Sequence, residues 1–288
     1  GEVVESLALP PQAYIHPRLS PDERRLAFTI FEGGIYHIWV YDLPSGPATQ
    51  LTTESQNFLP LWMPPDGQRV AFSSFRAGPL NVYRLPVDGS QPAQTLVEGP
   101  MDQVASCWAP DGRGLLFEEL NHDSGFDIGI ITVEDSNTPR LLLHEGWHEK
   151  HGVFSPDGRW IAYQSDREDA EEIYVVSYPE LVTKKISTSG GHNPVWSKDG
   201  KELFYRVGNR MMTVNIETEP ELKVADPELL FDGRLLATDS WGSNYDVSSD
   251  GQRFLMVEED EEQPSANQLV VVLNWFEELE RLVPTGNH

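Results

Sequence analysis

A six-fold internal repeat is the feature that most constrains the fold of this chain. The phrase Ser-Pro-Asp-Gly, or a close variant of it, occurs six times in the 288 residues. The repeat aspartates are Asp22, Asp66, Asp111, Asp157, Asp199 and Asp250, with spacings of 44, 45, 46, 42 and 51 residues. A period of about 40–50 residues is typical of the four-stranded blades of a β-propeller.

The residues that follow each repeat aspartate keep a fixed register. An apolar residue stands four positions later in all six copies, and an aromatic residue stands six positions later in five of them. The residues at the later position are Phe28, Phe72, Phe117, Tyr163, Tyr205 and Met256. Because a step of two residues is the period of a β-strand, both positions face the same side of the strand that follows the Asp-Gly turn. Each repeat therefore predicts four strands, with a tight turn after the first.

These repeats predict an all-β fold, a six-bladed β-propeller with four-stranded antiparallel blades. Each blade buries its faces against its two neighbours, and a closed ring leaves no exposed end. We expect a single domain over residues 1–288, with blades near 14–53, 54–99, 100–146, 147–189, 190–236 and 237–283. A strand within residues 2–9 closes the last blade, and apolar residues at helical spacing predict a short C-terminal helix over Asn274–Val283.

The charge of the chain narrows the range of partners. It has 21 Lys and Arg against 46 Asp and Glu, a formal net charge of −25. A field of this sign repels phosphate, which argues against nucleic acid and anionic membrane surfaces as partners. No apolar run reaches the roughly 18–20 residues of a membrane span, so we expect no membrane insertion by this domain. We expect a monomer that binds a protein, a peptide or a small ligand.

The compartment is only weakly constrained by the sequence. The chain has one cysteine, Cys107, so no internal disulfide can form. It starts at Gly1 without an initiator Met, which is typical of a trimmed chain, and we expect a signal peptide or an upstream domain before it. We predict an extracytoplasmic or periplasmic location, with the cytoplasm as the alternative.

Two repeats carry a family resemblance. Pro194–Gly200 reads Pro-Val-Trp-Ser-Lys-Asp-Gly, and Phe154–Tyr163 reads Phe-Ser-Pro-Asp-Gly-Arg-Trp-Ile-Ala-Tyr. This pattern, in register over essentially the whole chain, resembles the TolB-type β-propeller repeat. Segments such as Trp160–Asp166 and Tyr245–Val257 are also similar to the C-terminal propellers of bacterial proteins with an N-terminal serine/threonine kinase or transcriptional-regulator domain. This second resemblance implies a sensor module of a larger signalling protein, and no kinase signature occurs in the chain itself.

The candidate site residues precede the inner strands, at one mouth of the expected channel. The residues six positions before the repeat aspartates are His16, Pro60, Ala105, His151, Asn193 and Asn244. Their His and Asn side chains, together with His148 and His192, are the candidate ligand-binding groups of the channel mouth. Within this set His148, His151 and His192 are candidate metal ligands for a divalent cation such as calcium. The alternative is a polar, water-filled channel without a specific ligand.

Two tryptophans and one motif lie near the same mouth. Trp147 and Trp241 are candidate anchors for a partner, and packing between neighbouring blades is the alternative. The segment His144–His148 matches the zinc-protease motif H-E-x-x-H. That motif needs a helix, and the short stretch between two strands has no room for one, so we expect no zinc-protease site.

No catalytic motif supports an enzyme. The chain lacks a G-x-S-x-G elbow, and Cys107 stands beside Trp108 in an inner strand, where we expect it to be buried. Peptidases with a related propeller carry their Ser-Asp-His triad in a separate α/β domain. We therefore predict a non-catalytic binding or sensor propeller without a cofactor, and not an enzyme. The alternatives are a metal-dependent lyase or lactonase that uses the channel-mouth His and Asn residues, and a TolB-like assembly or scaffold protein.

We expect the repeat aspartates to stabilise the turns by accepting hydrogen bonds from backbone N–H groups.

Overall fold

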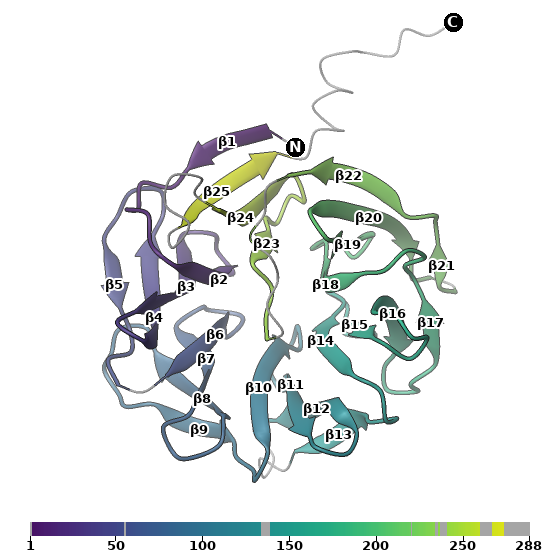
Figure 1. The fold of residues 1–288 in the computed structure, drawn as a ribbon, viewed down its shortest axis with the longest axis horizontal. Helices are drawn as coiled ribbons and strands as arrows, with labels where there is room; N and C mark the ends of the chain where they lie inside the picture. Colours follow the sequence, from purple (N-terminus) through teal and green to yellow (C-terminus); the bar gives the residue numbers. More distant parts are fainter. Residues whose placement is uncertain are drawn as a thin grey trace, which may run out of the picture.

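The computed structural model describes residues 2–54, 56–133, 139–219, 221–233, 236, 241–259 and 267–273. Within these residues the chain forms six antiparallel sheets, arranged as a ring around a central axis (Figure 1). The same residues contain no helix, and hence none long and apolar enough to cross a membrane. The predicted all-β six-bladed propeller is confirmed, whereas the helix predicted over Asn274–Val283 lies outside the described residues.

The strands of each sheet follow one another from the channel outward. The first sheet contains β2 (Tyr14–Leu19), β3 (Arg25–Glu32), β4 (Ile35–Asp42) and β5 (Ala48–Gln50). The second contains β6 (Asn57–Trp62), β7 (Arg69–Ser74), β8 (Asn81–Pro86) and β9 (Gln94–Val97). The third contains β10 (Asp102–Trp108), β11 (Gly114–Asn121), β12 (Gly125–Thr132) and β13 (Arg140–Leu143).

The remaining sheets keep this order with two variations. The fourth contains β14 (Glu149–Phe154), β15 (Trp160–Ser165), β16 (Glu172–Ser177) and β17 (Thr183–Lys185). The fifth contains β18 (His192–Trp196), β19 (Glu202–Val207), β20 (Arg210–Glu217), β21 (Lys223–Val224) and β22 (Glu228–Asp232). The sixth contains β23 (Tyr245–Val247), β24 (Arg253–Glu259), β25 (Asn267–Leu273) and β1 (Glu2–Ser6).

The N-terminal strand closes the ring, as the repeat pattern predicts. β1 pairs antiparallel with β25, with Val3 opposite Val272 and Ser6 opposite Val270. The last blade thus combines three strands from the end of the chain with one strand from its beginning. This pairing joins the first described strand to the last described strand and closes the ring.

The fifth blade differs from the predicted four strands. Both β21 and β22 pair with β20, β21 near the end of β20 and β22 near its beginning. Ile216 lies opposite Val224, and Arg210 lies opposite Asp232. Pro227 stands between the two outer strands, and because proline has no backbone N–H it interrupts the pairing and divides the outer edge in two.

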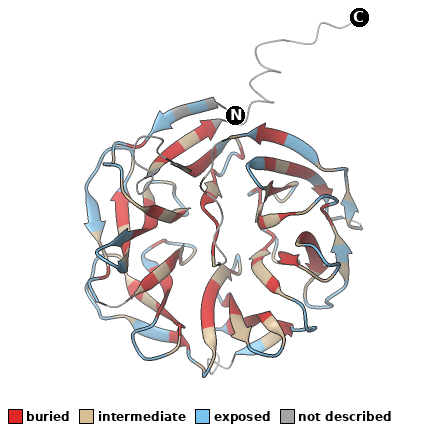
Figure 2. Ribbon diagram, viewed as in Figure 1, coloured by how far each residue is buried: buried red, intermediate tan, exposed pale blue. Residues whose placement is uncertain are grey.

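Neighbouring blades pack on the faces that the repeat pattern predicts. The side chains four and six residues after each repeat aspartate are at most 1% exposed. Together with residues of the adjacent blade they form apolar clusters, such as the one that contains Ile161, Tyr163 and Leu142. Each such side chain contributes roughly 1.5–3 kcal/mol through its burial. Figure 2 shows that buried residues occupy the inner and middle strands, whereas exposed residues concentrate in the outer strands and loops.

The repeat aspartates stabilise the turns between the first and second strands. In all six turns Oδ1 of the aspartate accepts a hydrogen bond from the backbone N–H two residues later, at 2.9–3.1 Å. In four turns a serine donates its hydroxyl to the same oxygen; these are Ser20, Ser155, Ser197 and Ser248. The hydrogen bonds from Ser20 and from the Arg24 amide lower the pKa of Asp22. The predicted structural role of these aspartates is confirmed.

A serine substitution tests the contribution of one turn. Ser155 Oγ donates to Asp157 and accepts from the backbone N–H of Trp160 at 3.0 Å. We expect Ser155→Ala to lower the free energy of unfolding by about 1–2 kcal/mol, because two hydrogen bonds are lost at a partly buried turn. Urea unfolding followed by circular dichroism measures the change. The control is Ala109→Ser at the equivalent position of the third repeat, which we expect to leave stability unchanged or raise it. Equal stability of Ser155→Ala and the wild type would contradict the assignment.

Candidate functional site

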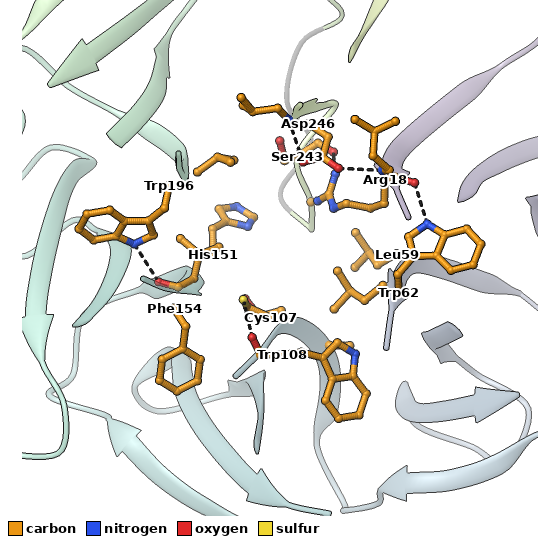
Figure 3. Close-up of a pocket in the computed structure, with 18 of the residues that line it drawn as sticks. Arg18, Leu59, Trp62, Cys107, Trp108, His151, Phe154, Trp196, Ser243 and Asp246 are labelled. Carbon is orange, nitrogen blue, oxygen red and sulfur yellow. Dashed lines mark hydrogen bonds between the residues drawn. The ribbon is translucent and has the colours of Figure 1, made fainter. Parts of the chain in front are cut away.

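A pocket of about 410 Å³ lies on the axis of the ring, where the inner strands of all six blades face one another (Figure 3). Its wall includes residues from every inner strand, among them Arg18, Leu59, Cys107, His151, Asn193 and Asp246. A volume of this size is within the range of pockets that hold small molecules. Most of the wall is apolar, and a few polar groups from opposite blades point into it.

The segment Trp241–Gly242 closes one end of the pocket. A Cβ atom on Gly242 would lie 2.1 Å from Cδ2 of Leu59 and 2.7 Å from Cδ2 of His16, so the backbone lies against the first and second blades. The Trp241 ring packs edge-on against Phe126 of the third blade, with 5.4 Å between ring centroids. The segment precedes β23 and thus spans the channel from the sixth blade.

The opposite end of the pocket reaches the turns of the repeat. The residues that line it there include Pro21, Pro64, Pro110, Pro156 and Lys198. These residues follow the inner strands, whereas Trp241–Gly242 lies near their starts. The pocket therefore has a closed end near the starts of the inner strands and extends toward the face formed by the Ser-Pro-Asp-Gly turns.

The inner strands share a bulge with a left-handed backbone. His16, Leu59, His151 and Asn193 have φ angles of 54°, 57°, 53° and 52°. The pairing register of each of their strands shifts at this place. Outside glycine, His, Asn and Asp tolerate this conformation best. The recurrence of His and Asn six residues before the repeat aspartate is therefore explained by the backbone that these positions adopt.

Side chains from the neighbouring blade hold the amides at these positions. The backbone N–H of His151 donates to Oε1 of Glu118 at 2.7 Å, and that of Asn193 donates to Oε1 of Gln164 at 3.3 Å. The N–H of His16 donates to Oδ1 of Asn244 at 3.0 Å. Asn244, predicted as a candidate ligand, thus has a structural role at the junction of the sixth and first blades.

The structure separates the three predicted metal ligands. Only His151 lines the channel pocket. His148 accepts the backbone N–H of Phe126 on Nδ1 at 3.2 Å, and Nδ1 of His192 lies 3.0 Å from Oε2 of Glu171. In the part of the chain that the structure describes, no three His, Cys, Asp or Glu side chains gather as a metal-binding group. The three histidines lie apart because His148 and His192 come before the bulges of their strands, whereas His151 lies within one.

The two predicted anchors also differ from each other. Trp147 is 45% exposed and lies beside a surface groove. Trp241 is half-buried, and it packs against a cluster formed by Leu59, Leu80 and Val104. Trp241 therefore packs between blades, which the sequence analysis gave as the alternative to a partner-binding role. Trp147, in contrast, is accessible to a partner.

Arg18 and Asp246 join the sixth blade to the first across the pocket wall. Arg18 Nη1 donates to the backbone oxygens of Ser243 and Tyr245 at 3.0 and 3.2 Å. Oδ2 of Asp246 accepts the backbone N–H of Leu19 at 2.8 Å. Burial raises the pKa of Asp246, and the positive charge of Arg18 opposes that rise. The pair is thus part of the ring closure as well as of the pocket wall.

Glu118 and His151 form an acid–base pair in the pocket wall. Burial raises the pKa of Glu118 to about 7, although the hydrogen bond from the His151 amide stabilises its charged form. Nδ1 of His151 lies 3.8 Å from Oε1 of the same carboxyl. A carboxyl that titrates near neutral pH can take up and release protons. The signal that could have identified it is a charged residue inside the apolar run Leu115–Leu120.

Ser106 and Cys107 also line the pocket, and neither is activated as a nucleophile. Ser106 donates its hydroxyl to the backbone oxygen of Gly152 at 2.8 Å. Cys107, expected to be buried, is partly exposed toward the channel, and desolvation raises the pKa of its thiol to about 11. Because the thiolate is the nucleophilic form, Cys107 is unreactive at neutral pH.

Comparison with known proteins places this arrangement among known propellers. No protein-family model matches the chain. The uncharacterized protein Atu1656 of Agrobacterium fabrum is 28% identical over 200 residues, which are 68% of this chain and 66% of that protein. The uncharacterized peptidase YuxL of Bacillus subtilis is 24% identical over 54% of this chain. The tricorn protease homolog 1 of Streptomyces coelicolor is 26% identical over 75% of it. The matches span only 30% and 20% of these last two proteins.

Solved structures identify the fold. TolB from Acinetobacter baumannii superposes with a TM-score of 0.68 at 14% identity, covering 87% of this chain and 64% of TolB. The chain has a TolB-like six-bladed β-propeller fold. An oligogalacturonate lyase in complex with manganese gives a TM-score of 0.64 at 13% identity and covers 91% of this TolB-like propeller and 90% of the lyase. A puromycin-hydrolyzing peptidase from Mycobacterium tuberculosis gives 0.61 at 14% identity, over 89% of this chain and 46% of the peptidase. At these identities the likeness concerns the fold alone.

The prediction that this chain is not an enzyme is contradicted by these comparisons. Two relatives in sequence are named as a peptidase and a tricorn protease homolog, and two proteins of the same fold are a lyase and a peptidase. The prediction relied on the absence of familiar catalytic motifs from the TolB-like propeller. That absence carries no weight where the catalytic residues come from scattered loops or from another domain.

A charge-removing substitution tests the environment of Glu118. Because burial raises its pKa in the folded chain, the folded state binds this proton more tightly than the unfolded state does. The contribution of Glu118 to stability is therefore present below pH 4.5, is lost as the pH rises to about 7 and stays lost above that. Glu118→Gln keeps an acceptor for the His151 amide and removes the loss of stability that follows ionisation of the buried carboxyl. We expect the variant to gain about 2–4 °C in melting temperature relative to the wild type between pH 4.5 and 7.5. The exposed control Glu180→Gln gains nothing, and a pH-independent difference for Glu118→Gln would contradict the assignment.

Proposed function

We propose that this chain is a ligand-binding propeller that takes the end of a peptide, or a small amide-containing molecule, into the channel pocket. The observation that carries the proposal is the pocket of about 410 Å³, closed at one end by Trp241–Gly242 and extending to the turn face at the other. A mostly apolar pocket with a few polar groups that converge from different elements is the usual form of a small-ligand site.

The polar groups of the pocket favour an amide ligand. Asn193 is 1% exposed, and within the described residues neither its side-chain oxygen nor its side-chain nitrogen has a hydrogen-bond partner. A buried amide without partners costs roughly 1–3 kcal/mol. A rotation of the Asn193 side chain toward a ligand that supplies both a donor and an acceptor would remove this penalty. A peptide group supplies both. The hydroxyl of Ser106, already donated to Gly152, can still accept a hydrogen bond from such a ligand.

The comparisons support a role for this binding in an enzymatic reaction. The chain matches 30% of the length of the peptidase YuxL, so a peptide-binding propeller would supply substrate recognition within a larger protein. The similarity to propellers of kinase and regulator proteins would make the same pocket a sensor, and a TolB-like assembly role would make the bound peptide part of a protein partner. An extracytoplasmic location fits the assembly role best.

The first experiment uses Cys107, the single cysteine of the chain, as a reporter of pocket occupancy. Alkylation with iodoacetamide at pH 9 is followed by mass spectrometry in the presence of di-, tri- and tetrapeptides with free or blocked ends. We expect at least one class of peptide to slow alkylation about fivefold or more, because a bound ligand covers the thiol. Asn193→Gly, which preserves the positive φ, should abolish the protection. Trp147→Ala, outside the pocket, should leave it intact. Alkylation unaffected by every peptide would overturn the proposal.

Proton transfer by Glu118 and His151 is a second candidate function. The observation that favours it is the pKa of Glu118, raised to about 7, beside an imidazole in the wall of a ligand-sized pocket. Groups with such pKa values serve as general acids and bases in lyases and hydrolases. His151→Asn, which suits the left-handed backbone, and Glu118→Gln are the variants that test it.

Activity assays separate this candidate from binding alone. Oligogalacturonate and aminoacyl amides are suitable test substrates, each with and without added manganese, calcium or zinc. We expect turnover of one substrate class, and a decrease of about 100-fold or more for Glu118→Gln, the size of effect expected for general acid–base catalysis. Glu119→Gln, one residue further along the same strand, is the matched control. Turnover that both Glu118→Gln and His151→Asn leave unchanged would exclude the acid–base role.

A further inference from the structure

A groove of about 510 Å³ lies on the face opposite to the turns, between the third and fourth blades. One wall is the hairpin that connects β11 to β12, over residues 120–125, and the other is the segment 146–148 before β14. Asp166, at the end of β15, completes the lining. The groove shares no lining residue with the channel pocket.

The groove presents an exposed indole. Trp147 is 45% exposed, although an indole of this size is usually covered. In the described part of the chain, the cations near the groove contact other rings: Lys150 Nζ lies 4.8 Å from the ring centroid of Phe126, and the Arg167 guanidinium lies 4.9 Å from that of Tyr174. Trp147 takes part in no cation–π pair among the described residues, so its ring faces remain available to a cation from outside.

The charge of the groove has one sign. Among the described residues, Asp123 and Asp166 line it together with the imidazoles of His122 and His148, and neither lysine nor arginine does. Glu145, beside Trp147 in sequence, has a side chain that is 65% exposed and lies 3.1 Å from Arg167. This ion pair and the contact with Tyr174 engage Arg167, whose side chain is not part of the groove lining.

Two buried carboxyls behind the wall add to the negative field. Oδ2 of Asp127 accepts the hydroxyl of Ser124, a lining residue, while Oδ1 has no partner within the described residues. Glu149 is fully buried, and both of its oxygens lack a hydrogen-bond partner there. Burial and the nearby Asp127 raise the pKa of Glu149 to about 7, so a positive charge in the groove would stabilise its ionised form.

From this combination we propose that the groove binds a lysine or arginine side chain of a basic protein partner. The exposed indole offers a cation–π surface, and the aspartates offer acceptors for N–H donors. The buried carboxyls add a negative field that Arg167 offsets only in part, because burial and Asp127 still raise the pKa of Glu149. The partner is basic because the chain as a whole carries a formal charge of −25, which steers cationic surfaces toward it. The groove is a second site, independent of the ligand in the channel.

The test uses Nα-acetyl-arginine amide as the probe and Nα-acetyl-citrulline amide as its uncharged isostere, both titrated into the chain by calorimetry and by saturation-transfer NMR. We expect the arginine probe to bind at least fivefold more tightly than the citrulline probe. Trp147→Ala and Asp166→Asn should each weaken the arginine probe about fivefold. Asp166→Asn retains an oxygen acceptor for the His148 amide, which now donates to Asp166 at 2.8 Å, so the loop is preserved.

Two control variants separate this site from general attraction to an acidic protein. Phe75→Ala removes another exposed aromatic ring, and Glu180→Gln removes one charge near the turn face, so neither should change the affinity of the arginine probe. Equal affinities of the two probes, or equal losses in Trp147→Ala and Phe75→Ala, would overturn the proposal. Ser106→Trp, which fills the channel, should leave the arginine probe bound while it abolishes peptide protection of Cys107. Failure of one site is thereby distinguished from failure of the other.

Discussion

The left-handed bulge of the inner strands is the constraint on which the rest of the structure depends. It turns a backbone N–H of each affected strand out of its own sheet, and that donor must be satisfied because the site is buried. The neighbouring blade supplies the acceptor, Glu118 for His151 and Gln164 for Asn193. At Ala105, where the strand shifts register without a left-handed φ angle, Ser73 accepts the N–H in the same way. A polar side chain is therefore required in the middle of otherwise apolar second strands. The bulge thus links the blades to one another and brings these polar groups into the wall of the channel.

At the ring closure, the first and sixth blades are also held together by side chains of one blade that accept backbone N–H groups of the other. The first and sixth blades meet through Asn244 and Asp246, which accept the backbone N–H groups of His16 and Leu19. Arg18 adds two hydrogen bonds to carbonyl oxygens of the sixth blade. These contacts act at the inside of the ring, while the pairing of β1 with β25 acts at the outside. Closure at both radii fixes the position of β23, and hence of the segment Trp241–Gly242 that covers the channel.

The fold was predictable from the sequence because it depends on features that repeat. Six copies of one turn, followed at fixed distances by apolar and aromatic residues such as Leu203 and Tyr205, specify six equivalent blades. The site was less predictable because it depends on features that differ between the copies. His16, His151 and Asn193 recur for a reason of backbone conformation, which in the sequence looks the same as a ring of ligands. The glutamate at position 118 has no counterpart in the repeat pattern, so that pattern could not identify Glu118 as a site residue.

Long-range geometry accounts for the remaining differences. His148 and His151 are three residues apart in sequence, yet His148 accepts the Phe126 amide of the third blade, whereas His151 lines the channel pocket. A bulged strand does not alternate its side chains regularly, so their orientation could not be derived from a period of two. The closing of the channel by Trp241 depends on a contact with Phe126, more than one hundred residues earlier, which no local pattern indicates.

The interface between the third and fourth blades concentrates the chemistry of the molecule. Glu118, Asp127 and Glu149 are each at most 2% exposed there, and burial raises the pKa of all three. Apolar residues at these positions would stabilise the fold, because an unpaired buried carboxyl is among the costliest groups in a protein interior. Glu118 faces the channel pocket, whereas Asp127 and Glu149 lie behind the groove beside Trp147. Because β11 runs from the channel wall to the groove, this interface with its three buried carboxyls borders both candidate sites, as expected where stability has been given up for binding or catalysis.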